Sequence, residues 1–200
     1  MAMHNELWFP SVIWSAVINN VDNGALKKFA YDKIKEDPQG RQISNNKGYQ
    51  SVDIKPRENA EIDHLVHTLD KEMLEIAQQT GLKMPKIYNI WVNVNYPGSS
   101  NNMHHHIGAI FSGVYYVDAD PKLKQGNISF ERTDNAEYHI PPSAIEKITY
   151  FTAQQSNYAS STGGLFIFPG WLKHKVGTND SNKDRISISF NYGIKPKNAN

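Results

Sequence analysis

The chain has no cysteine among its 200 residues, so disulfide bonds and thiolate metal ligands are excluded. It also lacks an excess of either charge, because 21 basic and 20 acidic residues give a formal charge of +1. A basic surface is typical of proteins that bind nucleic acids or anionic membranes, so neither partner is expected. No apolar run approaches the roughly 20 residues of a membrane span, and no signal peptide is recognised. These absences predict a cytoplasmic protein.

The composition suits one globular domain, with 39% hydrophobic and 20% charged residues over 1–200. In the first part, apolar residues recur at helical spacing in 26–34 and 62–76, with Pro38 and Gly81 as expected stops. We therefore expect a helical part, 1–86, that packs on a second part, 87–194.

The second part has the alternation that is typical of strands. Strands are predicted from residue 87 onward, in 90–95, 109–117, 127–131, 165–168 and 185–192. A further strand is expected near 148–152, within a long polar segment, 134–158, that otherwise reads as a loop near the site. Short strands at this density predict a mainly β fold, a sandwich or barrel with flanking helices on its outside.

Histidines are the first sign of chemistry. His104 and His106 project to the same side of an extended strand, while the intervening histidine projects to the other. Such a pair can hold one metal ion, although a histidine run can also be a plain surface cluster. His174 follows a buried strand and a tight turn, from which it can reach a neighbouring strand. Together these three histidines predict a mononuclear metal site.

An anion site is predicted 11 residues after the last of these histidines (185 − 174). Arg185 and Ser187 share the polar face of a strand whose other face is apolar. If the apolar face packs against the helices, the arginine points inward, where it requires an anion such as a carboxylate. If this strand lies exposed at an edge, the arginine is merely solvated. Tyr116 lies on a strand from which its hydroxyl can reach the same anion, although aromatic core packing explains it equally well.

In this order of parts the sequence resembles the iron(II)/2-oxoglutarate-dependent oxygenase superfamily, which carries a His-x-acid pair, a distal histidine and then an Arg-x-Ser. More narrowly, it is similar to oxygenases of bacteria and marine phages in segments 91–95, 112–117 and 168–174. The resemblance implies a double-stranded β-helix, the cupin-like jelly roll. It also implies Fe(II) as the metal and 2-oxoglutarate as cosubstrate, which Arg185, Ser187, Tyr116 and Asn93 would bind. A small-molecule or peptidyl substrate would be hydroxylated, in the host cytoplasm if the protein is phage-encoded.

One position departs from the superfamily pattern, because His106 stands where Asp or Glu is usual. Three neutral histidines leave an Fe(II) site with one more positive charge than two histidines and a carboxylate. Two other functions therefore remain open. The first is a cupin-like three-histidine metalloenzyme that uses no 2-oxo acid, and the second is a non-enzymatic β-sandwich binding protein. An Arg185 that faces inward favours the oxygenase, and a solvated Arg185 favours the cupin-like enzyme. A lack of metal binding favours the non-enzymatic binding protein.

Overall fold

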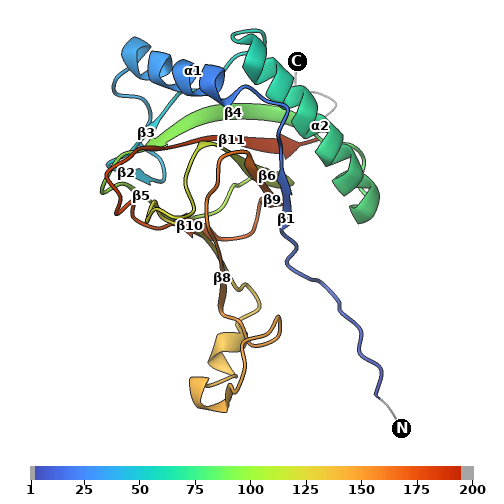
Figure 1. The fold of residues 1–200 in the computed structure, drawn as a ribbon. Coiled ribbons are helices and arrows are strands. Elements are labelled where there is room, and N and C mark those ends of the chain that lie inside the picture. Colours follow the sequence, from blue (N-terminus) through green and yellow to red (C-terminus); the bar gives the residue numbers. More distant parts are fainter. Residues whose placement is uncertain (1–2, 195–200) are drawn as a thin grey trace.

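Two antiparallel sheets form the body of the protein (Figure 1). The structure is a computed structural model, and it describes residues 3–194. The larger sheet has the order β1 (Trp14–Val17), β9 (Gly164–Pro169), β6 (Phe111–Asp118), β11 (Arg185–Gly193), β4 (Lys86–Asn95) and β3 (Tyr49–Gln50). The smaller has the order β2 (Asn45–Asn46), β5 (Ser100–His104), β10 (His174–Val176), β7 (Ile128–Glu131) and β8 (Gln155–Tyr158). This arrangement confirms the predicted mainly β fold with flanking helices.

Two helices cover the outer face of the larger sheet, α1 (Asn23–Glu36) and α2 (Ala60–Thr80) (Figure 1). The side chain of Asp22 caps the start of α1, where it accepts a hydrogen bond from the amide of Ala25 at 3.0 Å. The second helix ends at Gly81 in the left-handed conformation, with φ of 70°, which suits glycine. Within residues 3–194, no helix is both long enough and apolar enough to cross a membrane.

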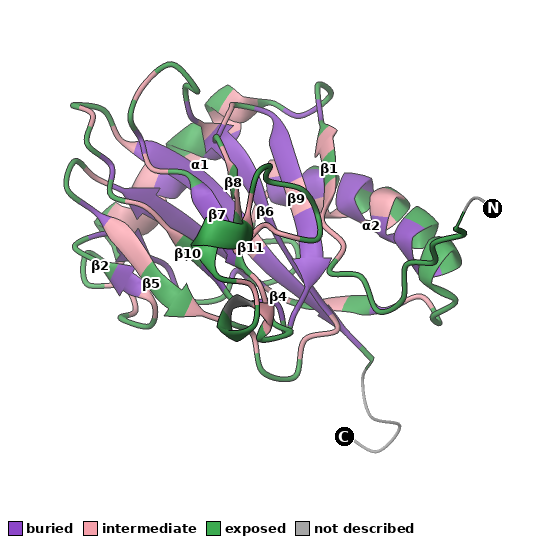
Figure 2. Cartoon of the chain, turned by 90° about the horizontal axis from the view of Figure 1, so that it is seen from below, coloured by how far each residue is buried: buried purple, intermediate pink, exposed green. Residues whose placement is uncertain are grey.

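The hydrophobic core lies between these helices and the larger sheet. Ile186, Ile188 and Phe190 of β11 are fully buried in it, together with Leu26 of α1 and Leu65 of α2. Because side chains alternate along a strand, the opposite face of β11 points into the space between the two sheets. Figure 2 shows the buried strands of this body in purple.

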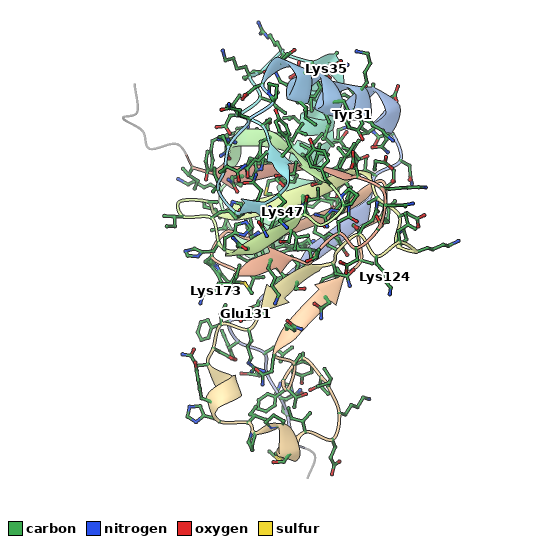
Figure 3. The ribbon with its side chains drawn as sticks, turned by 90° about the vertical axis from the view of Figure 1, so that its left-hand side faces the viewer. Tyr31, Lys35, Lys47, Lys124, Glu131 and Lys173 are labelled. Atoms are coloured by element: carbon green, nitrogen blue, oxygen red, sulfur yellow. The ribbon has the colours of Figure 1, made fainter. Side chains whose placement is uncertain are left out.

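A long excursion, residues 132–154, leaves the smaller sheet between β7 and β8 and projects from the body (Figure 1). It contains two short 3₁₀ helices, η1 (Ala136–Tyr138) and η2 (Pro142–Ala144), and is mostly exposed. Figure 3 labels Glu131 and Lys173 where the excursion joins the body, and the amide of the first donates to the carbonyl of the second at 2.9 Å.

The prediction of a strand near 148–152 is wrong. This segment folds back on itself, because the amide of Ala153 donates to the carbonyl of Thr149 at 2.9 Å and the hydroxyl of Thr152 donates to the carbonyl of Lys147 at 2.8 Å. The strand of this region is β8, which begins later and pairs with β7. The one-domain organisation over 1–200 stays a prediction, and residues 1–2 and 195–200 lie outside the described residues.

Candidate active site

Three histidines meet at one end of the smaller sheet. His104 ends β5, His174 begins β10, and the two are directly opposite each other in the antiparallel register. His106 lies two residues beyond the end of β5, where its amide donates to the carbonyl of Gly170 at 2.8 Å. One nitrogen from each ring lies within 4.8 Å of the others. The Nε2 atoms of His106 and His174 are 3.3 Å apart.

Two of the rings are oriented by backbone carbonyls. Nδ1 of His104 lies 2.7 Å from the carbonyl oxygen of Asn102, and Nδ1 of His174 lies 2.9 Å from that of Leu172. In the neutral tautomer that donates these bonds, Nε2 keeps its lone pair, as metal-ligating histidines require. His105 is exposed and takes no part in the cluster.

Burial keeps these imidazoles neutral. It lowers the pKa of His174 to about 3 and that of His106 to about 4, and the neighbouring His104 adds to both effects. Burial also lowers the pKa of His104 itself. A metal ion therefore does not have to displace protons from these rings at neutral pH.

Arg185 lies at the start of β11 and faces the space between the sheets, with only 2% of its surface exposed. Its NH1 donates to the carbonyls of Gln125 at 3.1 Å and Gly126 at 2.8 Å, while its buried Nε has no hydrogen-bond partner. No carboxylate within residues 3–194 forms an ion pair with it. The preceding Asp184 turns the other way and accepts from the hydroxyl of Tyr31 at 2.8 Å.

One cavity joins the histidines to this arginine. It lies between the two sheets. Ser187, Tyr116 and Asn93 line it, so all the residues predicted for the anion lie around it. The amide of Asn93 donates to the hydroxyl of Ser189 at 2.9 Å, and the Tyr116 ring centre lies 5.9 Å from Cζ of Arg185.

Sequence reasoning missed part of this wall. Asn95 donates to Asn101 at 3.0 Å, and Asn101 in turn lies 3.3 Å from the hydroxyl of Ser44. Trp91 lies against His106, with ring centres 6.0 Å apart and planes at 28°. The available signal was the alternation of β4, since Trp91, Asn93 and Asn95 occupy its inward face.

No carboxylate lines the cavity among the described residues. The nearest acids downstream of the histidine run in sequence serve elsewhere. Asp118 pairs with Lys27 of α1 at 2.6 Å, and Asp120 accepts from the amide of Lys122 at 2.9 Å. The donor set thus consists of three imidazoles and one buried guanidinium, which fits a divalent cation beside an anionic ligand.

Residues 89–191 match a protein-family model described as "Putative 2OG-Fe(II) oxygenase". No curated protein matches the chain. Among solved structures, a prolyl-4-hydroxylase of Pseudomonas putida is similar, at 13% identity and a TM-score of 0.66, over 93% of this chain and 94% of that one.

Two further solved structures are similar. One is a viral collagen prolyl hydroxylase of Paramecium bursaria Chlorella virus-1 in its 2-oxoglutarate complex, at 13% identity and a TM-score of 0.56, covering 91% of this chain and 96% of that one. The other is HygX of Streptomyces hygroscopicus with nickel and 2-oxoglutarate, at 10% identity and a TM-score of 0.62, covering 92% and 84%. At these identities the likeness is one of fold, and it confirms the expected double-stranded β-helix.

Proposed function

The chain belongs to the 2OG-Fe(II) oxygenase family, and we propose that His104, His106 and His174 hold its iron while Arg185 binds its 2-oxoglutarate. The protein is thus an iron(II)- and 2-oxoglutarate-dependent dioxygenase. Bound iron would supply the oxygen chemistry, in which one atom of O2 enters succinate as 2-oxoglutarate loses carbon dioxide and the other enters the substrate as a hydroxyl group. The chain's own residues position the reactants and exclude water.

The observation that carries this proposal is the buried, unpaired guanidinium. Desolvation of Arg185 lowers its pKa, and its Nε lacks a hydrogen-bond partner. A cation in this position is costly unless an anion meets it, and its planar fork suits the distal carboxylate of a 2-oxo diacid. Ser187, buried two residues further along the same face, would add a hydroxyl donor to that carboxylate.

Tyr116 and Asn93 would have lesser parts in the same pocket. Tyr116 is fully buried, and burial raises the pKa of its hydroxyl, which therefore stays a donor at neutral pH. The side-chain NH2 group of Asn93, which lines the pocket, already donates to the hydroxyl of Ser189. We therefore expect Tyr116 to donate to the cosubstrate and Asn93 to shape the pocket.

The inward orientation of Arg185 favours this function over a cupin-like enzyme that uses no 2-oxo acid. Such an enzyme has no need of a buried guanidinium in the metal cavity. A non-enzymatic binding protein would likewise have no need for three converging imidazoles, two of which already have Nδ1 bonded to a backbone carbonyl. Because iron(II) must stay reduced, we propose a reducing compartment such as the cytoplasm, which suits a cysteine-free chain.

For the substrate we propose an extended polypeptide segment. A groove beside the three histidines is lined by residues 6–11 and 130–134. Phe130 and Leu172 also line this groove, and both contact His174. Exposed aromatic rings, including Trp8 and Phe151, lie along it. In the described part of the chain, β8 also leaves one edge unpaired, to which a peptide strand can add.

The experiment for the site is an anaerobic titration of the apoprotein with Fe(II) and then 2-oxoglutarate, followed by the visible charge-transfer band of the chelate. We expect the band in the wild type and its loss in His174→Ala and Arg185→Ala. His105→Ala, an exposed neighbour, is the matched control and should keep the band. Metal binding without the band would favour the cupin-like enzyme, and no metal binding would refute both enzyme functions.

The experiment for the substrate class measures succinate formation in the presence of a pool of random peptides. We expect peptides to stimulate turnover, and Trp8→Ala to raise the KM for the stimulating peptides without changing the affinity for 2-oxoglutarate. Stimulation by small metabolites alone would refute the polypeptide substrate.

A further inference from the structure

The metal cavity has a fixed positive charge and, among residues 3–194, no acidic side chain in its lining to compensate it. Within the described residues its lining contains no Asp or Glu, and Arg185 contributes one buried positive charge. Imidazoles bind a metal ion only as neutral ligands, so His104, His106 and His174 contribute no charge. A divalent metal in this site therefore gives a total of three positive charges (two from the metal and one from the arginine).

A carboxylate in place of His106 would change this sum. It would lower the total to two, which the two carboxylates of 2-oxoglutarate neutralise. With the imidazole, no carboxylate in the lining formed by the described residues offsets the charges of the metal and the guanidinium until an anion enters. The bound dianion then supplies all the negative charge that offsets the metal and Arg185.

We infer that the neutral ligand His106 makes the coupling between divalent metal and 2-oxoglutarate stronger in this protein than a carboxylate at the same position would, because the dianion alone then offsets the charges of the metal and of Arg185. The inference rests on the proposed function and deepens it. Coupling between two ligands is reciprocal, so 2-oxoglutarate strengthens metal binding by the same factor by which metal strengthens 2-oxoglutarate binding. Metal loading of this protein therefore depends on the concentration of the dianion.

The position of His106 allows a direct test of charge. Its ring lies in the cavity beside Trp91 and within reach of both other ligands. Glutamate and glutamine reach about as far as histidine and differ from each other only in charge. His106→Glu therefore adds one negative charge to the ligand set, and His106→Gln is its neutral match.

The test measures the dissociation constant of cobalt(II) by calorimetry, without and with saturating 2-oxoglutarate. In the wild type we expect 2-oxoglutarate to tighten cobalt binding by about 100-fold, near the upper end of typical couplings. His106→Gln should bind cobalt more weakly but keep a similar factor. His106→Glu should bind cobalt more tightly on its own and show a factor at least about tenfold smaller.

A second control places the same charge outside the cavity. His105 is exposed, so the carboxylate of His105→Glu is screened by solvent and should leave the coupling factor unchanged. Circular dichroism and thermal unfolding of each variant establish that the fold is kept.

The outcomes separate this inference from the proposed function. Equal coupling factors in the wild type and His106→Glu, or failure of His106→Glu to bind cobalt, would overturn the inference and leave the oxygenase function intact. Independent binding of the two ligands in the wild type would overturn it as well. If 2-oxoglutarate failed to bind the cobalt-loaded protein at all, the proposed function would fail with it.

Discussion

Replacement of Arg185 by methionine should separate the stability of the fold from its affinity for the cosubstrate. In the apoprotein, desolvation of this buried cation costs several kcal/mol. Arg185 has no carboxylate partner among residues 3–194. Its compensation includes the Tyr116 ring, 5.9 Å from Cζ, and two NH1 hydrogen bonds, to Gln125 and Gly126, worth about 1.5–3 kcal/mol each. We therefore expect the free energy of unfolding of the Arg185→Met apoprotein to stay equal or to rise by about 1–2 kcal/mol.

The effect on cosubstrate binding should have the opposite sign. Loss of one partner of a buried, hydrogen-bonded charge pair costs about 3–5 kcal/mol, which corresponds to a loss of affinity for 2-oxoglutarate of about 100- to 5000-fold. Ser187 and Tyr116 would remain in the pocket, but neither carries a compensating charge.

Urea denaturation of the cobalt-loaded protein, with and without 2-oxoglutarate, measures both effects. At 100 times its dissociation constant, 2-oxoglutarate should stabilise the wild type by about 2.7 kcal/mol, and this increment should vanish in Arg185→Met. Arg41→Met is the matched control. NH2 of Arg41 forms an ion pair with Asp53 at 2.9 Å, and Arg41 does not line the cavity. The reasoning is refuted if Arg185→Met destabilises the apoprotein by more than about 2 kcal/mol while the increment from 2-oxoglutarate is unchanged.

Three further changes test other parts of the structure. His174→Ala should abolish tight metal binding, so that cobalt(II) no longer raises the Tm; an unchanged rise would remove His174 from the ligand set. Gly126→Ala places a Cβ 2.1 Å from the carbonyl oxygen of Gly177, at a position where φ is 84°, so it should displace the loop that holds Arg185. Calorimetry with each ligand should show that 2-oxoglutarate binding is weakened more than metal binding. Equal losses of the two affinities would contradict this expectation. Gly113→Ala places a Cβ 2.4 Å from the ring of Phe190 and should destabilise the protein by about 1–3 kcal/mol in chemical denaturation, and a neutral result would mean that this core is less tightly packed than described.

Much of the larger sheet could be predicted because its strands are long enough to show a period. The alternation of β11 separates Ile186 and Ile188 from Arg185 and Ser187, and the structure places the first pair in the core and the second in the cavity. The end of α2 was predictable for a local reason, since Gly81 adopts a backbone conformation that other residues avoid.

The shortest strands could not be predicted, since they exist only through pairing. β10 has three residues, too few for a period, and it forms because β5 and β7 bind it on both sides. β2 and β3 have two residues each and depend likewise on β5 and β4. The amino-terminal strand β1 pairs with β9, which is far away in the sequence.

The site was partly predictable for related reasons. The spacing of His104 and His106 suggested a common direction, but His106 lies past the strand, and its position depends on a contact with Gly170. Asn101 and Ser44 gave no signal, because their roles arise only where β2 and β5 meet the larger sheet. Local sequence thus indicates which residue types can act, and long-range pairing decides which of them meet.

The most direct test of the account is a crystal structure of the cobalt(II) and 2-oxoglutarate complex, with an anomalous difference map measured at the cobalt edge. The account predicts one strong peak within bonding distance of Nε2 of His104, His106 and His174, and the distal carboxylate of 2-oxoglutarate on the guanidinium of Arg185. A peak that lacks any of these three histidines, or a cosubstrate whose distal carboxylate is not at Arg185, would contradict it.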